Sequence, residues 1–346
     1  MGLSPSETAR TATPGPQHVD GRGEAVLMMT DVYRGLEGVE RGEIKYLRVL
    51  EQVARPWAAR RFWPEDEGLG QHAIISMHAH IFVKIHHGVV PVAEDGSACF
   101  VVPAEKNLFF EALDQDFMEV QRMRSFLNLR PGETRSCIGC HEERRLAPPS
   151  GTPMALAHPP SRLGPQPGET VPRPIYYPTD VQPVLDKHCV ACHNPKKPEG
   201  ELDLSGEPTT FFNRSYEQVM SKKLVAYIQE FHGPQPRAQK TNVVPLPPRS
   251  LGSHASGLIA VVREGHYDAK LSAEEMARLV TWADANAPYY GSYFGRRNLK
   301  YKDHPDFRPT PTLESASGTP PPDAQPYAQS PRPPAPLVPR LRLGTP

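Results

Sequence analysis

The first half of the chain has the apolar pattern of β-strands. Apolar and polar residues alternate over residues 42–50, as expected for a half-buried strand. Other extended or apolar runs of strand length occupy 25–33, 88–92, 98–102 and 108–113. Asp95-Gly96 separates two of these runs, which is typical of a hairpin. The pattern predicts a small β-sandwich-like domain from residue 24 to about 130.

The second half changes to a helical period. Helices are predicted over residues 180–188, 216–230, 253–264 and 272–285. The last is the clearest, because Ser272 and Glu275 form an S-x-x-E capping box ahead of an apolar face. We therefore expect an α+β chain, in which the β-sandwich-like domain is followed by a mostly helical domain.

Proline content marks the boundaries. The 346 residues exceed one typical domain. The 41 prolines gather near the N-terminus, between residues 146 and 174, and after residue 308. Such segments are typical of linkers and disordered tails. The predicted order is a tail, the β-rich domain, a linker, the helical domain and a second tail, at 1–23, 24–145, 146–174, 175–307 and 308–346.

Charge and hydropathy exclude two classes of partner. Lysine plus arginine and aspartate plus glutamate are equal, at 39 each, so net charge gives no argument for a nucleic acid or an anionic membrane surface. No apolar run reaches the length of a membrane-spanning helix.

Four of the five cysteines form two C-x-x-C pairs, each followed at once by histidine. This spacing lets two thiols form thioethers to one haem edge while the histidine binds the iron. The sequence therefore predicts two covalently bound haems c. The predicted residues are Cys137, Cys140 and His141 for the first haem, and Cys189, Cys192 and His193 for the second.

Zinc and thiol redox chemistry are the alternatives. A closed zinc site needs four ligands, but the two pairs lie about fifty residues apart, whereas zinc ribbons separate theirs by about 15 to 20. A thioredoxin-like motif would accompany a βαβ pattern, which neither pair shows. The fifth cysteine, Cys99, lies on an apolar strand and is expected to be a buried small hydrophobe.

The sixth iron ligands are less determined. For the second haem we favour His266, at the end of a predicted helix, with His254, Met220 and Met276 as alternatives. For the first haem the residues alone do not discriminate, and an open iron is equally compatible. The candidates there are His72, His78, His80, His86, His87, Met118 and Met123. Neighbours on a strand point to opposite faces, so at most one of His86 and His87 could face a cofactor.

The ligand set separates two functions. An iron with two histidine ligands has no open position and transfers electrons between redox partner proteins. An open first haem could instead bind a small nitrogen or oxygen compound, which would make the chain a haem oxidoreductase. A zinc-stabilised interaction module is the third hypothesis.

Several segments carry a family resemblance. They are residues 31–36, 42–45, 90–97, 110–114, 121–126, 136–141, 180–193 and 281–289. Together they resemble the hydrazine synthase alpha-subunit family, over about residues 24 to 308. The resemblance implies a middle domain followed by a c-type cytochrome domain, and it supports His266 as the partner of His193.

One departure from the family pattern concerns the chemistry. In hydrazine synthase a tyrosine four residues beyond the first motif's histidine holds the iron, and that histidine turns to zinc. Arg145 occupies this position here and can serve as neither ligand. We therefore expect a relative rather than a true hydrazine synthase, with His141 as an ordinary iron ligand.

Haem attachment also predicts where the protein works. Attachment to paired cysteines normally follows export, so we expect a periplasmic or otherwise extracytoplasmic location. Residues 1–20 contain no apolar signal-peptide core, and the larger relatives carry a β-propeller upstream. The chain is therefore expected to be a fragment of a larger exported protein, or to have a mis-assigned start.

Overall fold

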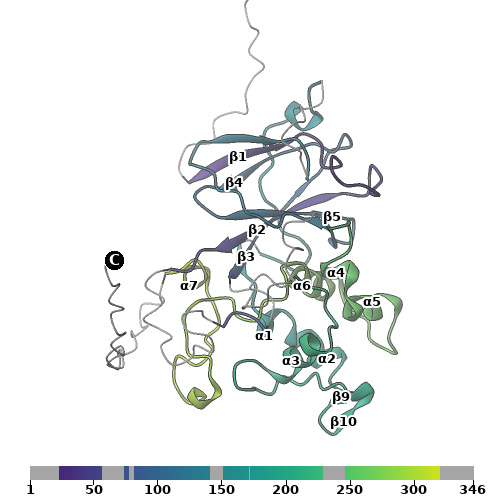
Figure 1. The fold of residues 1–346 in the computed structure, drawn as a ribbon, viewed down its shortest axis with the longest axis vertical. Helices are drawn as coiled ribbons and strands as arrows, with labels where there is room; N and C mark the ends of the chain where they lie inside the picture. Colours follow the sequence, from purple (N-terminus) through teal and green to yellow (C-terminus); the bar gives the residue numbers. More distant parts are fainter. Residues whose placement is uncertain are drawn as a thin grey trace, which may run out of the picture.

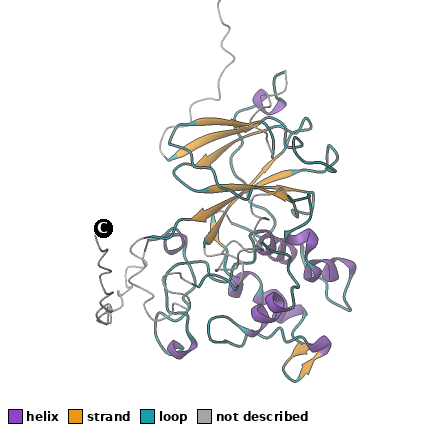
Figure 2. Ribbon diagram, viewed as in Figure 1, coloured by secondary structure: helices purple, strands orange, loops and turns teal. Residues whose placement is uncertain are grey.

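The chain is described by a computed structural model, which covers residues 23–56, 74–77, 82–140, 151–170, 172–228 and 246–319. These residues form three layers: a three-stranded sheet, a five-stranded sheet and a layer of short helices (Figures 1 and 2). The expected α+β class and the β-sandwich are confirmed. No helix in the described ranges has the length and apolarity needed to cross a membrane.

The two sheets share a sandwich core. The three-stranded sheet has the order β4-β1-β7, with strands β1 Glu24–Met29, β4 Ala98–Pro103 and β7 Thr134–Cys137. The five-stranded sheet has the order β6-β5-β2-β3-β8, with strands β2 Tyr46–Val53, β3 Val83–Pro91, β5 Leu108–Leu113, β6 Glu119–Arg122 and β8 Arg173–Pro174. Alternation places Leu27 of β1 and Leu47 of β2 in one buried cluster between the sheets.

The outer face of the three-stranded sheet holds Cys99. It packs there with Val26 and Met28 and is 5% exposed. Its expected role as a buried small hydrophobe is confirmed.

The helical layer covers the other face of the five-stranded sheet (Figure 1). Leu50, Val83 and Phe109 of that sheet join Trp282 and Tyr177 of the helices in a second buried cluster. Tyr289, Tyr290 and Tyr293 belong to the same cluster. The middle sheet therefore buries apolar side chains on both faces.

The last predicted helix is confirmed, and the others differ from their predicted extents. The helices are α1 Tyr177–Asp180, α2 Gln182–His188, α3 Arg214–Ser221, α4 Gly252–Ala255, α5 Gly257–Glu264, α6 Ala273–Asp284 and α7 Leu313–Ala316. The helix predicted over 216–230 was wrong in its extent, because α3 ends at Ser221 and Lys223 adopts a positive φ of 55°. The capping box of α6 is confirmed, with both Ser272 and Glu275 side chains engaged.

The helix predicted over 253–264 is two helices. Ser256 between α4 and α5 has extended backbone, and its hydroxyl oxygen accepts a hydrogen bond from the Ala226 amide at 2.9 Å. This contact with a distant loop fixes Ser256 outside helical geometry.

The proline-rich boundaries are more ordered than predicted. The Ser161 amide donates to the Cys99 carbonyl at 2.8 Å, and Gly164 pairs with Val89 of β3, so residues 151–170 pack along the sheets. The predicted tail does not begin at 308, because α7 lies beyond it and Ala316 is fully buried. Residues 1–22 and 320–346 of the predicted tails lie outside the described residues.

A buried ionic cluster joins the middle sheet to the helices. Arg48 of β2 donates to Glu111 of β5 at 2.7 Å and to Asp284 of α6 at 3.0 Å, and all three side chains are fully buried. Arg122 pairs with Glu119 beside them. The five residues Arg48, Glu111, Glu119, Arg122 and Asp284 are called the joint cluster below.

Candidate haem sites

The second C-x-x-C-H motif forms one tight turn at the end of α2. The Cys189 amide donates to the Leu185 carbonyl at 2.8 Å and so continues the helix by one residue. The amides of Cys192 and His193 then both donate to the Cys189 carbonyl, at 3.1 and 3.0 Å. Both cysteines are free and half-buried. The turn therefore brings two thiols and one imidazole together, as haem attachment requires.

The tautomer of His193 is fixed by a backbone contact. Its Nδ1 lies 2.7 Å from the carbonyl oxygen of Glu199, in the short 3-10 helix Glu199–Glu201. A carbonyl can only accept, so Nδ1 carries the hydrogen and donates it. This leaves the Nε2 lone pair available to a metal, with the ring held in place by its other nitrogen.

His266 faces His193. The two imidazole ring centres are 6.1 Å apart and their planes differ by 21°. An ion bound at about 2 Å by a nitrogen of each ring would hold the ring centres about 6 Å apart. The spacing therefore fits an iron between the two rings.

A tight turn presents His266. Gly265 has φ +93° and Tyr267 φ +50°, and the Ala269 amide donates to the His266 carbonyl at 3.1 Å. The Tyr267 ring stands perpendicular to His266 at 4.8 Å and is 88% exposed. This edge of the site therefore opens to solvent.

The start of α6 contacts the end of α2. Glu275 accepts from Lys187 at 2.7 Å and contacts His188 at 3.0 Å, next to the second motif. The hydrogen bond from Lys187, followed by those from Ser272 and His188, lowers the pKa of Glu275 to about 2. The carboxylate is thus charged at neutral pH and ties α6 to the end of α2.

The alternative ligands of the second haem are engaged elsewhere. His254 lies 2.9 Å from Asp114, at the end of β5. Met220 is buried within the helical core, and Met276 packs against that core. Of the four candidates, the structure brings His266 to His193.

The first motif begins on a strand rather than a helix. Cys137 ends β7 beside Met29 of β1, and the Thr30 amide donates to the Cys137 carbonyl at 2.9 Å. A Cβ atom on Gly139 would lie 2.5 Å from the Arg34 carbonyl, so this turn accepts only glycine without a shift. Burial raises the pKa of the Cys140 thiol to about 12. His141 and Arg145 lie outside the described residues.

The candidate sixth ligands of the first haem have other neighbours. His86 is fully buried 2.9 Å from Glu169, and burial lowers its pKa to about 4. His87 is the extra residue of a bulge in β3 and lies 2.9 Å from Glu51. Met118 is buried in the helical core. His72, His78 and His80 lie outside the described residues.

The two motifs lie in different layers. Cys137 belongs to the three-stranded sheet and Cys189 to the helical layer, with the five-stranded sheet between them (Figure 1). One zinc ion cannot bind both pairs in this arrangement. The geometry favours two separate centres.

Comparisons with known proteins agree with the β-rich half. Residues 42–142 match the family model described as "Hydrazine synthase alpha subunit middle domain". Through this segment the chain is a relative of the hydrazine synthase alpha subunit. A search of curated proteins finds no match.

A solved structure shares the fold of this chain. It is the Kuenenia stuttgartiensis hydrazine synthase, with a TM-score of 0.54 and 16% sequence identity. The similarity covers 81% of this chain and 45% of the other, so the chain spans less than half the length of that protein. At this identity the likeness shows the fold.

Proposed function

We propose that this chain is a dihaem c-type cytochrome that transfers electrons as a subunit or fragment of a larger exported redox protein. The observation that carries the proposal is the facing pair His193 and His266, whose ring centres lie 6.1 Å apart. Kinship with a subunit of a redox enzyme supports a role beside partner proteins.

The chain's own residues give the second site its properties. Cys189 and Cys192 would hold the haem edge, and His193 and His266 would bind the iron. When bound, haem c supplies a one-electron couple. The His193 Nδ1 hydrogen bond to the Glu199 carbonyl makes Nε2 a stronger donor to the iron. If both histidines bind the iron, no position would remain for a substrate, and the exposed edge at Tyr267 would allow contact with a redox partner.

The first haem supports a second candidate function. Cys137 and Cys140 would attach it, with His141 as its predicted axial ligand. His86 and His87, two candidates for the other axial position, contact Glu169 and Glu51 instead. These contacts are compatible with an open position, at which a haem oxidoreductase could bind a small nitrogen or oxygen compound.

Spectroscopy on the full chain tests both. The chain would be produced behind an export signal in a host with haem-attachment machinery, and haem staining after denaturation would count covalent haems. Absorption spectra with and without carbon monoxide would follow. Two low-spin haems that ignore carbon monoxide support electron transfer alone, and one carbon monoxide-sensitive haem supports the oxidoreductase. A protein without haem stain refutes both.

A matched pair of variants assigns the second site. His266→Ala should make one further haem sensitive to carbon monoxide, because it opens that iron. His254→Ala should leave the spectra unchanged, since His254 contacts Asp114. Identical spectra for wild type and His266→Ala would remove His266 from the ligand set.

A further inference from the structure

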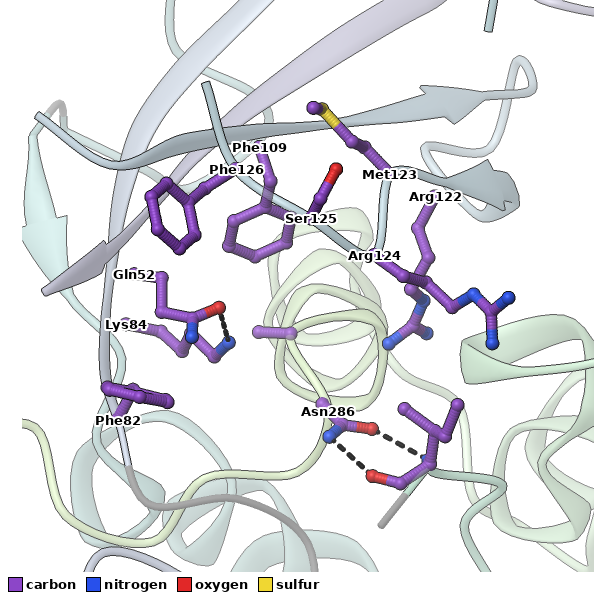
Figure 3. A pocket seen from close by; sticks show the side chains of 12 residues that line it. Gln52, Phe82, Lys84, Phe109, Arg122, Met123, Arg124, Ser125, Phe126 and Asn286 are labelled. Carbon is purple, nitrogen blue, oxygen red and sulfur yellow. Dashed lines mark hydrogen bonds between the residues drawn. The ribbon is translucent and has the colours of Figure 1, made fainter. Parts of the chain in front are cut away.

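A cavity of about 400 Å³ lies between the five-stranded sheet and the end of α6, apart from both cysteine motifs (Figure 3). Its size suits a one-ring molecule, at the lower end of ligand pockets. The described lining residues are Gln52, Phe82, Lys84, Phe109, Arg122, Met123, Arg124, Ser125, Phe126, Ile228, Ala285 and Asn286. The haem chemistry proposed above uses none of them, although Met123 was a candidate ligand of the first haem.

The wall combines aromatic surface with positive charge. Phe109 and Phe126 lie side by side on one part of it, and Arg122 and Arg124 project from another (Figure 3). Lys84 is the third cation, and none of the described lining residues is acidic. A ligand with an apolar body and a negatively charged group would therefore be complementary to this wall.

Glu119 binds two of the three guanidinium nitrogens of Arg122. The Nε and Nη2 of Arg122 donate to the two carboxylate oxygens of Glu119, and within the described residues Nη1 makes no hydrogen bond. The residue is 9% exposed, so a rigid, nearly buried guanidinium lines the cavity. Such a donor binds a carboxylate strongly because it needs little ordering.

Lys84 and Arg124 add to the positive potential. Lys84 is 2% exposed, donates to Gln52 at 3.3 Å and lies 4.8 Å from the Phe109 ring centre. Burial is the main cause that lowers the pKa of Arg124, and the nearby positive charge of Arg122 adds to it. A bound anion would offset the repulsion between these two charges.

We propose that this cavity binds a small organic anion, with a carboxylate against Arg122, Arg124 and Lys84 and an apolar ring against Phe109 and Phe126. Phe126 is 53% exposed, and a bound ring would cover it. No described lining residue takes part in the proposed haem attachment, so this proposal and the proposed function can fail separately.

Benzoate and benzamide make a matched pair of probes. They have the same ring and nearly the same size, and only benzoate is charged. Calorimetric titration of the full chain should show saturable binding of benzoate at millimolar concentration and binding about tenfold or more weaker for benzamide, because charge-assisted hydrogen bonds are lost. Equal binding of the two, or no saturable benzoate binding, overturns the proposal.

Variants locate the site. Arg124→Gln should weaken benzoate about tenfold, whereas Arg263→Gln, in an exposed pair with Asp116, should not change it. Phe126→Ala should weaken both probes and keeps the proposal testable if Arg124→Gln does not fold. Unchanged benzoate affinity in a folded Arg124→Gln or Phe126→Ala variant overturns the assignment. Inorganic phosphate that binds as tightly as benzoate also overturns it, because the aromatic wall would then contribute nothing to binding.

Discussion

Arg48 on the middle sheet donates to Asp284 on α6 at 3.0 Å, and neither side chain is exposed. The same carboxylate accepts from the backbone amides of Glu119 and Ser253, at 3.1 and 2.7 Å. A Cβ atom on Gly252 would lie within 2.8 Å of Asp284, Glu119 and Arg122. The joint cluster therefore fixes β2, β6, α4 and α6 at one point.

Breaking this pair should destabilise the fold strongly. Arg48→Met leaves Glu111 and Asp284 buried without their cation, a change that costs about 3–5 kcal/mol in buried pairs. Urea unfolding followed by circular dichroism measures it. Arg263→Gln removes an exposed ion pair and should cost below about 1 kcal/mol. A loss that small for Arg48→Met would mean that the joint cluster does not hold the layers together.

The joint cluster should also make stability depend on pH. It contains three carboxylates and two arginines, and burial raises the pKa of Glu119 to about 8, although Arg122 opposes the shift. Between the model-peptide value of about 4.3 and the folded value, the native state holds a proton that the unfolded state has lost. Stability should therefore fall as pH rises through this window, by at most about 1.4 kcal/mol per pH unit.

The effect of Glu119 on stability is best measured above about pH 6.5. Below that pH, the depressed pKa of His86 makes stability rise with pH and so opposes the effect of Glu119. Denaturant unfolding of wild type and Glu119→Gln at pH 6.5 and 8 tests this. The variant should lose less stability than wild type over that interval. Parallel curves would show that Glu119 is already ionised in the fold.

Replacing His266 by methionine should raise the reduction potential of one haem by on the order of 0.1 V, within the ~0.8 V that ligands and burial span. Spectroelectrochemistry of the holoprotein measures both potentials. His254→Met is the control, since His254 contacts Asp114. A potential that moves equally in the two variants would point to a general loosening of the helices instead.

Gly139→Ala should impair the first haem site alone. The new methyl group would lie 2.5 Å from the Arg34 carbonyl, so the turn between Cys137 and Cys140 must shift. We expect one covalent haem in place of two, measured by haem absorbance per chain. Gly164→Ala meets its nearest atom at 3.8 Å and should retain both. Full haem content in Gly139→Ala would contradict the described turn.

Local pattern predicted much of this fold. The strand at 108–113 and the capping box of α6 follow from neighbouring residues, and the structure shows them. The hairpin predicted at Asp95-Gly96 was wrong, because β3 and β4 on either side of this turn belong to different sheets and do not pair with each other. The break at Ser256 does not, because it depends on a hydrogen bond to Ala226, thirty residues away. The packing of residues 151–170 was missed for a similar reason, since proline content does not show that Ser161 and Gly164 pair with the sheets.

The candidate sites show the same division. The spacing of the cysteines identifies both motifs in the sequence, and His266 could be favoured as a ligand because it follows a predicted helix. The Asp114 partner of His254 joins residues 140 positions apart, so the sequence could not remove that alternative. The cationic cavity gave no signal either, because Lys84 and Arg122 lie on different strands and meet only across the folded sheet.

The middle sheet has a consequence for how the molecule can be divided. Leu50, Val83 and Phe109 pack against the helices, while Leu47 and Phe110 of the same strands fill the sandwich. Separating the sandwich from the helices would expose the apolar side chains on the helix-facing side of the middle sheet. It would also remove the surface against which the helices pack. The two halves that carry the cysteine motifs therefore form one folding unit, and neither half could be moved by itself into another protein.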